Sequence, residues 1–450
     1  MTNTIHLSGF ITTKDTTDRL SPLPSESFVD PIRPDLPEIR IDNNQKFQTI
    51  LGFGGAFTES AATTFYKMPE SVQREIIKAY FSTESGNGYT FGRTHINSCD
   101  FSLGNYAYDE SAGDTELTQF NISRDHNALI PFIQLALDTT QNQLKLLASP
   151  WSPPAWMKTN GQMNNGGELI SEYAGVWAQY YCQYIKKYAD AGVPIWGISV
   201  QNEPEAKQVW DSCLYSAEEE RDFVRDYLGP ALHKANLSHI NVVIWDHNRD
   251  QMFERAKVVF DDHEAAKYVW GTGFHWYCGD HFDNVQKLHD AYPTKQLIFT
   301  EGCQEGGPHI GSWDLGERYA KSIINDLNRW TVAWIDWNLI LDEQGGPNHT
   351  GNYCSSPIIA DTKTGQLFYQ NSYYYLGHFS RYIRPGSIRV YSESTIDELD
   401  VLAAVNTNGE TNTVIMNSSN KLIRFNLSFL NTQISIGSPA HSIMTLIHKS

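Results

Sequence analysis

The sequence has few positive charges and no long apolar stretch. Its 450 residues hold 34 lysines and arginines against 52 aspartates and glutamates, a formal net charge of −18. Proteins that bind nucleic acid or an anionic lipid surface usually carry a basic patch, and none occurs here. A membrane-spanning helix needs a run of about eighteen or more apolar residues, which is also missing. We therefore expect neither a nucleic-acid partner nor insertion into a membrane.

Cysteine is scarce, and the motifs of several enzyme classes are missing. The six cysteines form no C-x-x-C pair, which argues against a structural zinc site, and their wide spacing favours free buried thiols over disulfides. No P-loop, H-E-x-x-H or G-x-S-x-G motif occurs, and no G-x-G-x-x-G fingerprint follows the first predicted strand. We expect no metal and no cofactor. Residues 1–14 lack the basic and apolar segments of a secretory signal, so we expect a cytoplasmic protein.

Short apolar runs alternate with amphipathic stretches from about residue 47 onward. The predicted strands are 50–57, 89–96, 144–151, 194–201, 241–247, 269–277, 296–302 and 331–340. The predicted helices are 71–81, 170–188, 217–234 (opened by a capping-box pattern at Ser216-Ala-Glu-Glu219), 250–260, 315–328 and 367–380. Near-continuous apolar strands that alternate with helices are typical of a buried parallel sheet, and they predict an α/β fold, a (β/α)₈ TIM barrel. A doubly wound open sheet is the alternative.

The two ends of the chain differ from the middle. Short alternating strands are predicted at 387–392, 399–405, 412–416, 421–429 and 440–447, with a hairpin turn at Thr407-Asn-Gly409. The first forty or so residues are proline-rich and irregular, and they end in a strand-like run at 38–42. We predict a side all-β domain formed from both chain ends, with residues 1–46 and 385–450, beside a catalytic barrel of residues 47–384.

Polar residues recur where the predicted strands end, which is where barrels carry their catalytic groups. Glu203 ends the fourth strand, directly after Asn202, and Glu301 ends the seventh. Glycoside hydrolysis needs two carboxyl groups, one as acid and one as nucleophile or base, so this pair favours that chemistry. For either glutamate alone, a structural function as a helix cap or as an ion-pair partner of Arg93 is the alternative.

Other residues at the strand ends are weaker candidates. Aromatic residues make up 12% of the chain, and Trp151 and Trp337 could stack on a sugar ring or pack in the core. His275 could bind a metal, but no metal-ligand spacing links it to another histidine, so a hydrogen-bonding function is favoured. Cys303 follows Glu301 by two residues, and no histidine or helix start is placed to activate it as a nucleophile.

Seven long motifs follow one another in order between about residues 47 and 390. They are GFGGAFTES (52–60), INSCDFS (96–102), LLASPWSPPAWMKTNG (146–161), QNEP (201–204), HWY (275–277), TEGC (300–303) and WIDWNLILDEQGGPNHTGN (334–352). In type and order they resemble glycoside hydrolase family 30, and within it the branch that contains lysosomal glucosylceramidase. The resemblance implies a (β/α)₈ barrel with a side β-domain and a retaining mechanism.

The resemblance also implies functions for single residues. By motif, Glu203 matches the general acid/base of the family and Glu301 matches its nucleophile. The positions that match residues holding the terminal sugar are Asp100, Trp151, Asn202, Trp337 and Asn352. The positions that match residues around the nucleophile are Arg93 and Cys303, as supporting residues, and His275 and Tyr277, which we count with the substrate-binding set. The chain departs from the branch after Glu203 and at 246–248, and both regions are expected to shape the leaving-group side.

We predict a retaining exo-acting β-glycosidase that releases terminal β-D-glucosyl residues from a small-molecule or oligosaccharide β-glycoside. Glu203 must then be protonated near neutral pH, so we expect its pKa to be raised. A β-xylosidase is an alternative, because xylose lacks only the hydroxymethyl group of glucose. An endo-β-1,6-glucanase or a xylanase is another, and a carbohydrate-binding barrel without catalysis is the alternative of a different class. No oligomeric state is predicted.

Overall fold

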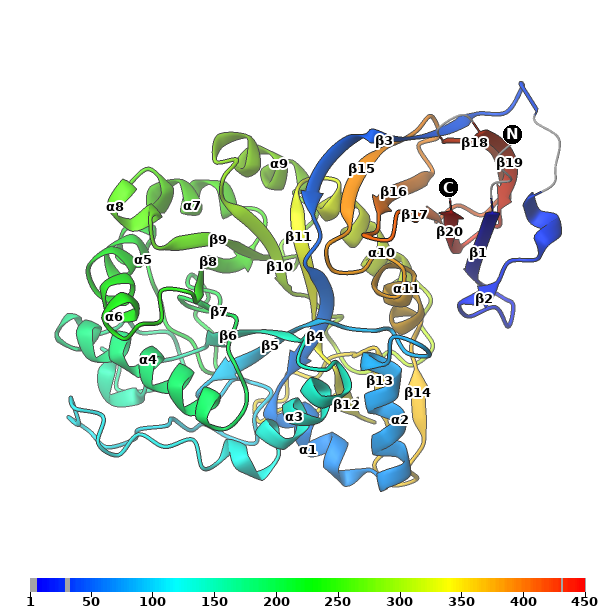
Figure 1. Ribbon diagram of the computed structural model, residues 1–450. Helices are drawn as coiled ribbons and strands as arrows, with labels where there is room; N and C mark the ends of the chain where they lie inside the picture. The colour runs from blue at the N-terminus through cyan, green and yellow to red at the C-terminus, as the bar shows by residue number, and fades with distance from the viewer. Residues whose placement is uncertain (1–5, 29–32, 430–431, 450) are drawn as a thin grey trace.

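The computed structural model describes residues 6–28, 33–429 and 432–449, which form a closed barrel with a β-sandwich beside it (Figure 1). The barrel strands are parallel and follow the order β10-β11-β4-β5-β6-β7-β8-β9. Their bounds are β4 (Gly52–Phe57), β5 (Phe91–Ile96), β6 (Lys145–Pro150), β7 (Gly197–Ser199), β8 (Asn241–Asn248), β9 (Val269–His275), β10 (Gln296–Glu301) and β11 (Thr331–Asn338). The predicted TIM barrel is confirmed, and the open-sheet alternative is wrong.

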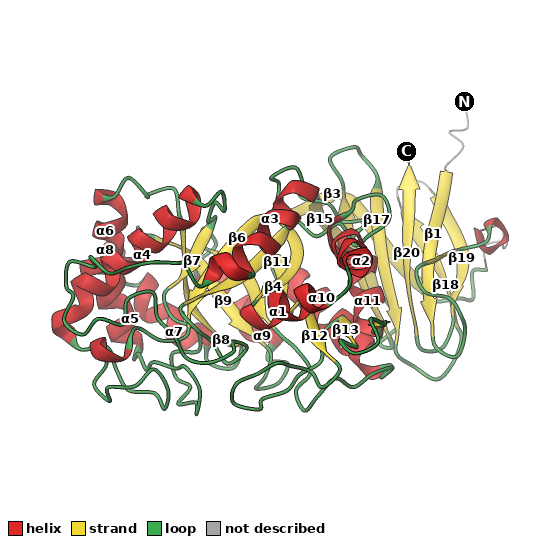
Figure 2. Ribbon diagram, turned by 90° about the horizontal axis from the view of Figure 1, so that it is seen from below, coloured by secondary structure: helices red, strands yellow, loops and turns green. Residues whose placement is uncertain are grey.

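Helices cover the outside of the barrel (Figure 2). They are α1 (Glu59–Lys67), α2 (Glu70–Phe81), α3 (Leu129–Thr139), α4 (Ala174–Asp190), α5 (Ala217–Phe223), α6 (Gly229–Lys234), α7 (Met252–Phe260), α8 (His263–Ala266), α9 (Phe282–Ala291), α10 (Asp314–Leu327) and α11 (Asn371–Ser380). A π turn, Val224–Leu228, joins α5 to α6, and the predicted capping box at Ser216 and Glu219 is formed. None of the helices in the described ranges has the length and apolarity that crossing a membrane requires.

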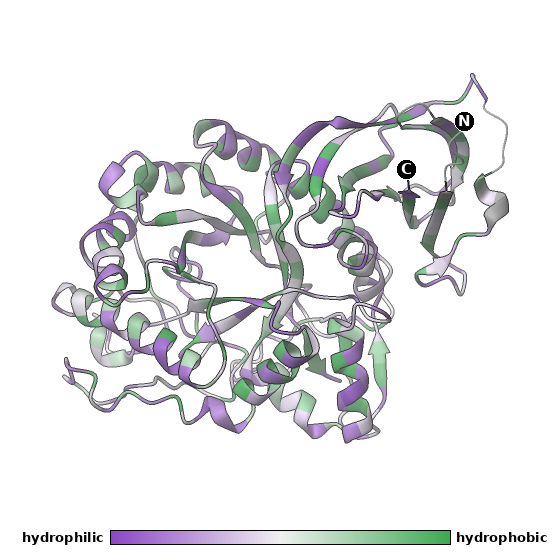
Figure 3. Ribbon diagram, in the orientation of Figure 1, coloured by the Kyte–Doolittle hydropathy of each residue, from purple (hydrophilic) through white to green (hydrophobic). Residues whose placement is uncertain are grey.

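The helices are amphipathic, and the barrel interior is filled with apolar side chains. In α2, Ile76 and Tyr80 are buried while Arg74 and Glu75 are exposed, and Figure 3 shows hydrophobic and hydrophilic bands alternating along this helix. The barrel interior is packed by Phe91, Leu147, Val243, Ile298, Ala333 and Ile335. Because this layer closes the interior, a substrate is expected at the carboxyl ends of the strands.

The helix predicted at 367–380 is wrong at its start. Strand β14 (Leu367–Tyr369) occupies its first residues, and α11 begins at Asn371. This strand pairs with β13 (Ile358–Ala360), which pairs with β12 (Ile340–Asp342). The pairing with a distant segment overrides the local helical pattern.

A nine-stranded sheet forms the sandwich, in the order β19-β18-β3-β15-β16-β17-β20-β1-β2. Its bounds are β1 (His6–Thr13), β2 (Ser21–Pro22), β3 (Glu38–Thr49), β15 (Ile388–Ser394), β16 (Leu399–Val405), β17 (Thr411–Asn417), β18 (Ile423–Phe429), β19 (Thr432–Ser438) and β20 (Ser442–Lys449). The predicted β-domain from both chain ends is confirmed. The prediction that the first forty or so residues are irregular is wrong for β1, which pairs along its whole length with β20. Residues 1–5 and 29–32, within the predicted domain segment 1–46, lie outside the described residues.

His378 of α11 joins the barrel to the sandwich. Its ring is buried, and its two nitrogens form hydrogen bonds with the hydroxyls of Thr445 on β20 (2.9 Å) and Thr12 on β1 (3.0 Å). Burial, assisted by the charge of Arg381, lowers the pKa of His378 to about 3. The folded protein therefore keeps this ring neutral at pH values at which the unfolded chain, with a histidine pKa of about 6.5, binds a proton.

The free energy of unfolding is therefore expected to fall as the pH drops below about 6.5. At about pH 5 the contribution of His378 is a loss of about 2 kcal/mol, from about 1.4 kcal/mol for each pH unit below the unfolded pKa. Urea unfolding of the wild type and of His378→Gln, at neutral pH and at about pH 5, measures this loss. The variant, which keeps hydrogen-bonding groups but does not titrate, should lose about 2 kcal/mol less on acidification. An equal pH dependence for the two proteins would contradict this assignment.

Candidate active site

A cavity of about 360 Å³ opens at the carboxyl ends of the barrel strands. The predicted site residues that line it are Asp100, Trp151, Asn202, Glu203, Tyr277, Glu301, Cys303, Trp337 and Asn352. Arg93 and His275 are not in the cavity wall, because both are fully buried. They contact the two glutamates from behind the wall. The structure thus brings all the predicted residues to one end of the barrel.

Arg93 of β5 is the centre of a buried hydrogen-bond network. Its Nη1 donates to Glu301 Oε2 (2.5 Å), and its Nη2 donates to Asp246 Oδ2 (2.8 Å) and to Asn202 Oδ1 (2.7 Å). Its Nε donates to Ser149 Oγ at 3.0 Å. The guanidinium has no exposed surface, so its charge must be balanced inside the protein. Asp246 and Glu301 supply that balance.

Asp246 is a member of this network to which the sequence interpretation gave no function. Its Oδ2 accepts from Arg93, from Ser149 Oγ (2.9 Å) and from Ser199 Oγ (2.5 Å), and its Oδ1 lies 3.1 Å from His275 Nε2. Burial by itself raises the pKa of Asp246, but the charge of Arg93 and the hydrogen bond with His275 hold it well below its usual range. The partners come from four other strands, so no local motif reveals the network.

The backbone at the end of β8 has an irregularity that places two side chains in the site. Trp245 and Asp246 have φ angles of 69° and 48°, and the register of β8 against β9 shifts between Trp245 and His247. Consecutive residues of a regular strand point to opposite faces. This bulge instead lets Asp246 reach Arg93 while His247 lines the cavity. Left-handed backbone at non-glycine residues costs about 1–3 kcal/mol each and is concentrated at functional sites.

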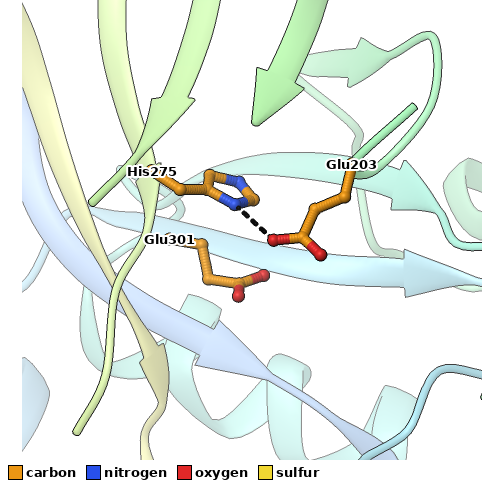
Figure 4. Close-up of side chains that lie close together, drawn as sticks. All are labelled: Glu203, His275 and Glu301. Carbon is orange, nitrogen blue, oxygen red and sulfur yellow. Dashed lines mark hydrogen bonds and ion pairs between the residues drawn. The ribbon is translucent and has the colours of Figure 1, made fainter. Parts of the chain in front are cut away.

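His275, the last residue of β9, bridges two carboxylates, and Figure 4 shows its ring directed at Glu203. Its Nδ1 lies 3.2 Å from Glu203 Oε1, and its Nε2 lies 3.1 Å from Asp246 Oδ1. Burial disfavours a charged ring, but the charge of Glu301 and the hydrogen bonds with Asp246 and Glu203 raise the pKa of His275 to about 9. His275 is therefore an imidazolium that donates to both carboxylates. Its position behind the cavity wall does not support the expected function as a sugar ligand.

Glu203 and Glu301 lie close together in the cavity (Figure 4). Three atoms, one carboxylate oxygen from each glutamate and one ring nitrogen of His275, all lie within 4.8 Å of one another. Burial raises the pKa of Glu301, although His275 and Arg93 oppose it. Burial by itself raises the pKa of Glu203, but the hydrogen bond with the charged His275 and the charge of Arg93 lower it. The raised pKa expected for Glu203 is thus wrong for the free protein, because His275 and Arg93 come from other strands and lie outside its motif.

The same three side chains, Glu203, His275 and Glu301, also have the spacing of a metal-binding set. A histidine ligand needs a free lone pair, but both nitrogens of His275 face carboxylate oxygens. Glu301 in turn already balances the charge of Arg93. The donor set therefore suits proton transfer and charge balance rather than a divalent cation.

Tyr277 and Cys303 lie beside Glu301. The Tyr277 hydroxyl donates to Glu301 Oε1 (2.9 Å) and lies 3.5 Å from Cys303 Sγ. A hydrogen bond with Cys354, together with burial, raises the pKa of the Cys303 thiol well above its usual value. The thiol stays protonated, so Cys303 is not an activated nucleophile. The six cysteines are free, as predicted, but the prediction that they are buried is wrong for Cys278, which is exposed.

Asp100 and two asparagines form a polar group at the cavity. Asp100 Oδ2 accepts from Asn352 Nδ2 and from Asn348 Nδ2, each at 3.2 Å, and burial raises the pKa of Asp100 to about 7. The sequence interpretation missed Asn348, although it lies in the same motif as Asn352. The rings of Trp151 and Trp337 stack 5.2 Å apart. Carboxylates and amides beside aromatic rings are the combination that holds the hydroxyls and the apolar face of a sugar.

Sequence and structure comparisons relate the chain to known proteins. The glycosyl hydrolase family 30 TIM-barrel domain matches residues 50–383, and the glycosyl hydrolase family 30 beta sandwich domain matches residues 386–446. Lysosomal acid glucosylceramidase of Mus musculus is 35% identical over 435 residues, which cover 91% of this chain and 83% of that protein. Endo-1,6-beta-D-glucanase of Neurospora crassa is 30% identical over 353 residues, covering 76% of this chain and 72% of that protein. The crystal structure of SrfJ from Salmonella typhimurium has a TM-score of 0.94 at 38% identity, covering 99% of this chain and 100% of that chain.

Proposed function

The chain belongs to glycoside hydrolase family 30 and is a glycoside hydrolase, and we propose that it is a retaining exo-β-glycosidase that releases terminal β-D-glucosyl residues. The separation of Glu203 and Glu301 carries the retaining mechanism of this proposal, since an oxygen of each lies within 4.8 Å of the other. Retaining glycosidases have their two carboxyl groups about 5–5.5 Å apart, whereas inverting enzymes need about 6.5–9.5 Å to admit a water molecule.

The reaction takes two steps at these glutamates. Glu301 attacks the anomeric carbon as the bond from that carbon to the glycosidic oxygen breaks, and Glu203 gives its proton to the departing oxygen. Glu203 then removes a proton from water, and the water oxygen displaces Glu301 from the anomeric carbon. Two displacements at one carbon release the sugar with its configuration retained.

The two carboxyl groups must share one proton for this sequence of events. That proton has to be on Glu203 when the glycosidic oxygen arrives, although burial favours a protonated Glu301 in the free protein. Arg93 and Tyr277 each donate to one oxygen of Glu301 and so stabilise its ionised form. The reaction therefore requires that the shared proton lie on Glu203, the group that donates it to the leaving oxygen, once the substrate is bound.

The size and lining of the cavity support action on a terminal sugar. Its volume of about 360 Å³ is at the lower end of the range of ligand pockets, about 300–1,000 Å³, which suits one sugar ring and part of a leaving group. Asp100 and Asn352 are placed to bind the hydroxyls of that ring. The likeness to the mouse lysosomal acid glucosylceramidase favours glucose as the sugar.

Two related activities are the alternative candidates for the function. The likeness to the endo-1,6-beta-D-glucanase of Neurospora crassa favours cleavage within a β-1,6-linked glucan as the second candidate. A β-xylosidase is the third, because the missing hydroxymethyl group changes discrimination by only about 1–3 kcal/mol.

Initial rates on 4-nitrophenyl β-glucoside, 4-nitrophenyl β-xyloside and a reduced β-1,6-linked glucotetraose test this proposal. We expect the glucoside to be cleaved at least about tenfold faster than the xyloside, and the tetraose to release glucose singly from its end. Release of disaccharide from the tetraose at early times would establish endo action instead. A xyloside preference would make the enzyme a β-xylosidase.

A further inference from the structure

His247 lies beside Glu203 in the cavity wall and has no function in the reaction described so far. Its side chain is 12% exposed, and its Nε2 lies 4.0 Å from Glu203 Oε1. Its ring packs against that of Trp245 at a centroid distance of 5.0 Å. Its Nδ1 is buried and has no hydrogen-bond partner among the described residues. The ring therefore has one nitrogen enclosed by protein and one nitrogen near Glu203.

The enclosed nitrogen determines how the ring is protonated. A charged ring would place an N–H without an acceptor in the interior, and burial lowers the pKa of His247, assisted by the charge of His275 and opposed by Glu203, Glu205 and Asp250. The ring is therefore neutral and carries one hydrogen. An unpartnered buried N–H is rarer in proteins than an unpartnered acceptor, so the hydrogen belongs on Nε2. His247 thus presents an uncharged N–H donor beside Glu203.

The distance between these two groups leaves room for one shared atom. Hydrogen bonds have donor–acceptor distances of about 2.7–3.2 Å, so 4.0 Å is too long for a direct bond between Nε2 and Oε1. One oxygen atom can instead lie about 2.8 Å from both. When Glu203 is protonated on Oε1, it can donate to such an oxygen and still accept from His275.

We propose that His247 Nε2–H and protonated Glu203 bind the glycosidic oxygen together, so that His247 is a catalytic residue for departure of the leaving group. As the bond from the anomeric carbon breaks, its electron pair stays on this oxygen, which takes the proton of Glu203 and keeps the hydrogen bond from His247. The oxygen carries more negative charge in the transition state than in the bound substrate. The donor therefore stabilises the transition state more than the ground state. This inference rests on the proposed function of Glu203 and Glu301.

The size of the effect must depend on the leaving group. The oxygen of an alkyl or sugar alcohol keeps its developing charge localised, so it gains from both donors. A dinitrophenolate spreads the charge over its ring and leaves without assistance. The bulge that aims His247 into the cavity thus favours glycosides of aliphatic and sugar alcohols.

The test compares His247→Phe with His247→Gln on methyl β-glucoside and 2,4-dinitrophenyl β-glucoside. Phenylalanine keeps a ring against Trp245 but loses the N–H, whereas glutamine supplies a side-chain N–H. We expect His247→Phe to lower kcat/KM on the methyl glucoside by about 10–100-fold and on the dinitrophenyl glucoside by less than about threefold. His247→Gln should recover part of the loss. If His247→Phe does not fold, His247→Leu takes its place in the comparison.

Two further measurements separate this function from others. If His247 acted by changing the pKa of Glu203, the alkaline limb of the pH profile of kcat/KM would move in His247→Phe for both substrates, and that result would overturn the proposal. An equal loss of kcat/KM on both substrates would overturn it as well. His289→Phe is the matched control, because His289 is a neutral ring stacked on Trp330 away from the cavity, and we expect its kcat/KM values unchanged.

Labelling of wild-type Glu301 by 2-deoxy-2-fluoroglucosyl fluoride is checked first. An unlabelled wild type overturns the proposed function itself, whereas a labelled one with a leaving-group-independent defect overturns only the inference about His247.

Discussion

Glu301→Gln is expected to lower kcat on an aryl β-glucoside by about 10⁴-fold or more, because an amide cannot form the glycosyl–enzyme bond. The fold should persist. The glutamine oxygen can still accept from Arg93, and its amide can donate to the Tyr277 hydroxyl, which accepts as well as donates. Arg93 keeps Asp246 as its charge partner. The free energy of unfolding should therefore change by no more than about 1 kcal/mol.

Steady-state rates and the intact mass after incubation with 2-deoxy-2-fluoroglucosyl fluoride measure this effect. The wild type should gain one fluoroglucosyl group, on Glu301, and the variant none. Glu203→Ala is the informative comparison. It should lose activity on alkyl glucosides and keep activity on dinitrophenyl glucoside. Azide should increase its turnover of dinitrophenyl glucoside, because azide attacks the glycosyl-enzyme without a general base. Glu305→Gln changes another carboxylate of the cavity wall and should keep its activity within about threefold. Labelling at a residue other than Glu301 would refute the nucleophile assignment.

The barrel strands could be predicted because each is a short apolar run with little alternation. Strand β11 is buried at every position, since a barrel strand has helices on one side and the packed interior on the other. Strands β14 and β1 could not be predicted in the same way. Each is defined by its pairing with β13 or β20, and no local pattern contains the identity of a distant partner.

The two glutamates could be found because each lies at or just beyond the carboxyl end of an apolar strand, which in a barrel faces the cavity; Glu301 ends β10 and Glu203 follows β7. Asp246 and His247 could be placed at a strand end but not assigned, because regular alternation would turn one of them away from the site. The bulge at Trp245 removes that alternation. The pKa of Glu203 could not be predicted for a related reason, since the direction of its shift depends on charged side chains, His275 and Arg93, that other strands bring beside it.

Arg93→Met is expected to lower the free energy of unfolding by about 3–5 kcal/mol, the usual cost of removing one partner from a buried ion pair. Methionine has a similar length but leaves Asp246 and Glu301 without the cation that both contact. The deficit should shrink as the pH falls, because Glu301, whose pKa burial raises, can then take up a proton and lose its charge. Activity should fall by about 10³-fold, since Glu301 loses the donor that orients it.

Urea unfolding at two pH values and kcat/KM on an aryl β-glucoside measure both effects. Arg74→Met is the matched control, because Arg74 is 73% exposed and lies 3.6 Å from Glu70 in a surface pair that contributes about 0–1 kcal/mol. Arg93→Met combined with Asp246→Asn tests the cause. If the loss comes from uncompensated charge, the double variant should be more stable than Arg93→Met, because the amide carries no charge that needs a partner. A double variant that is less stable than Arg93→Met would instead assign the loss to packing against Trp151 and Trp337, over which the guanidinium lies at 4.8 and 5.5 Å.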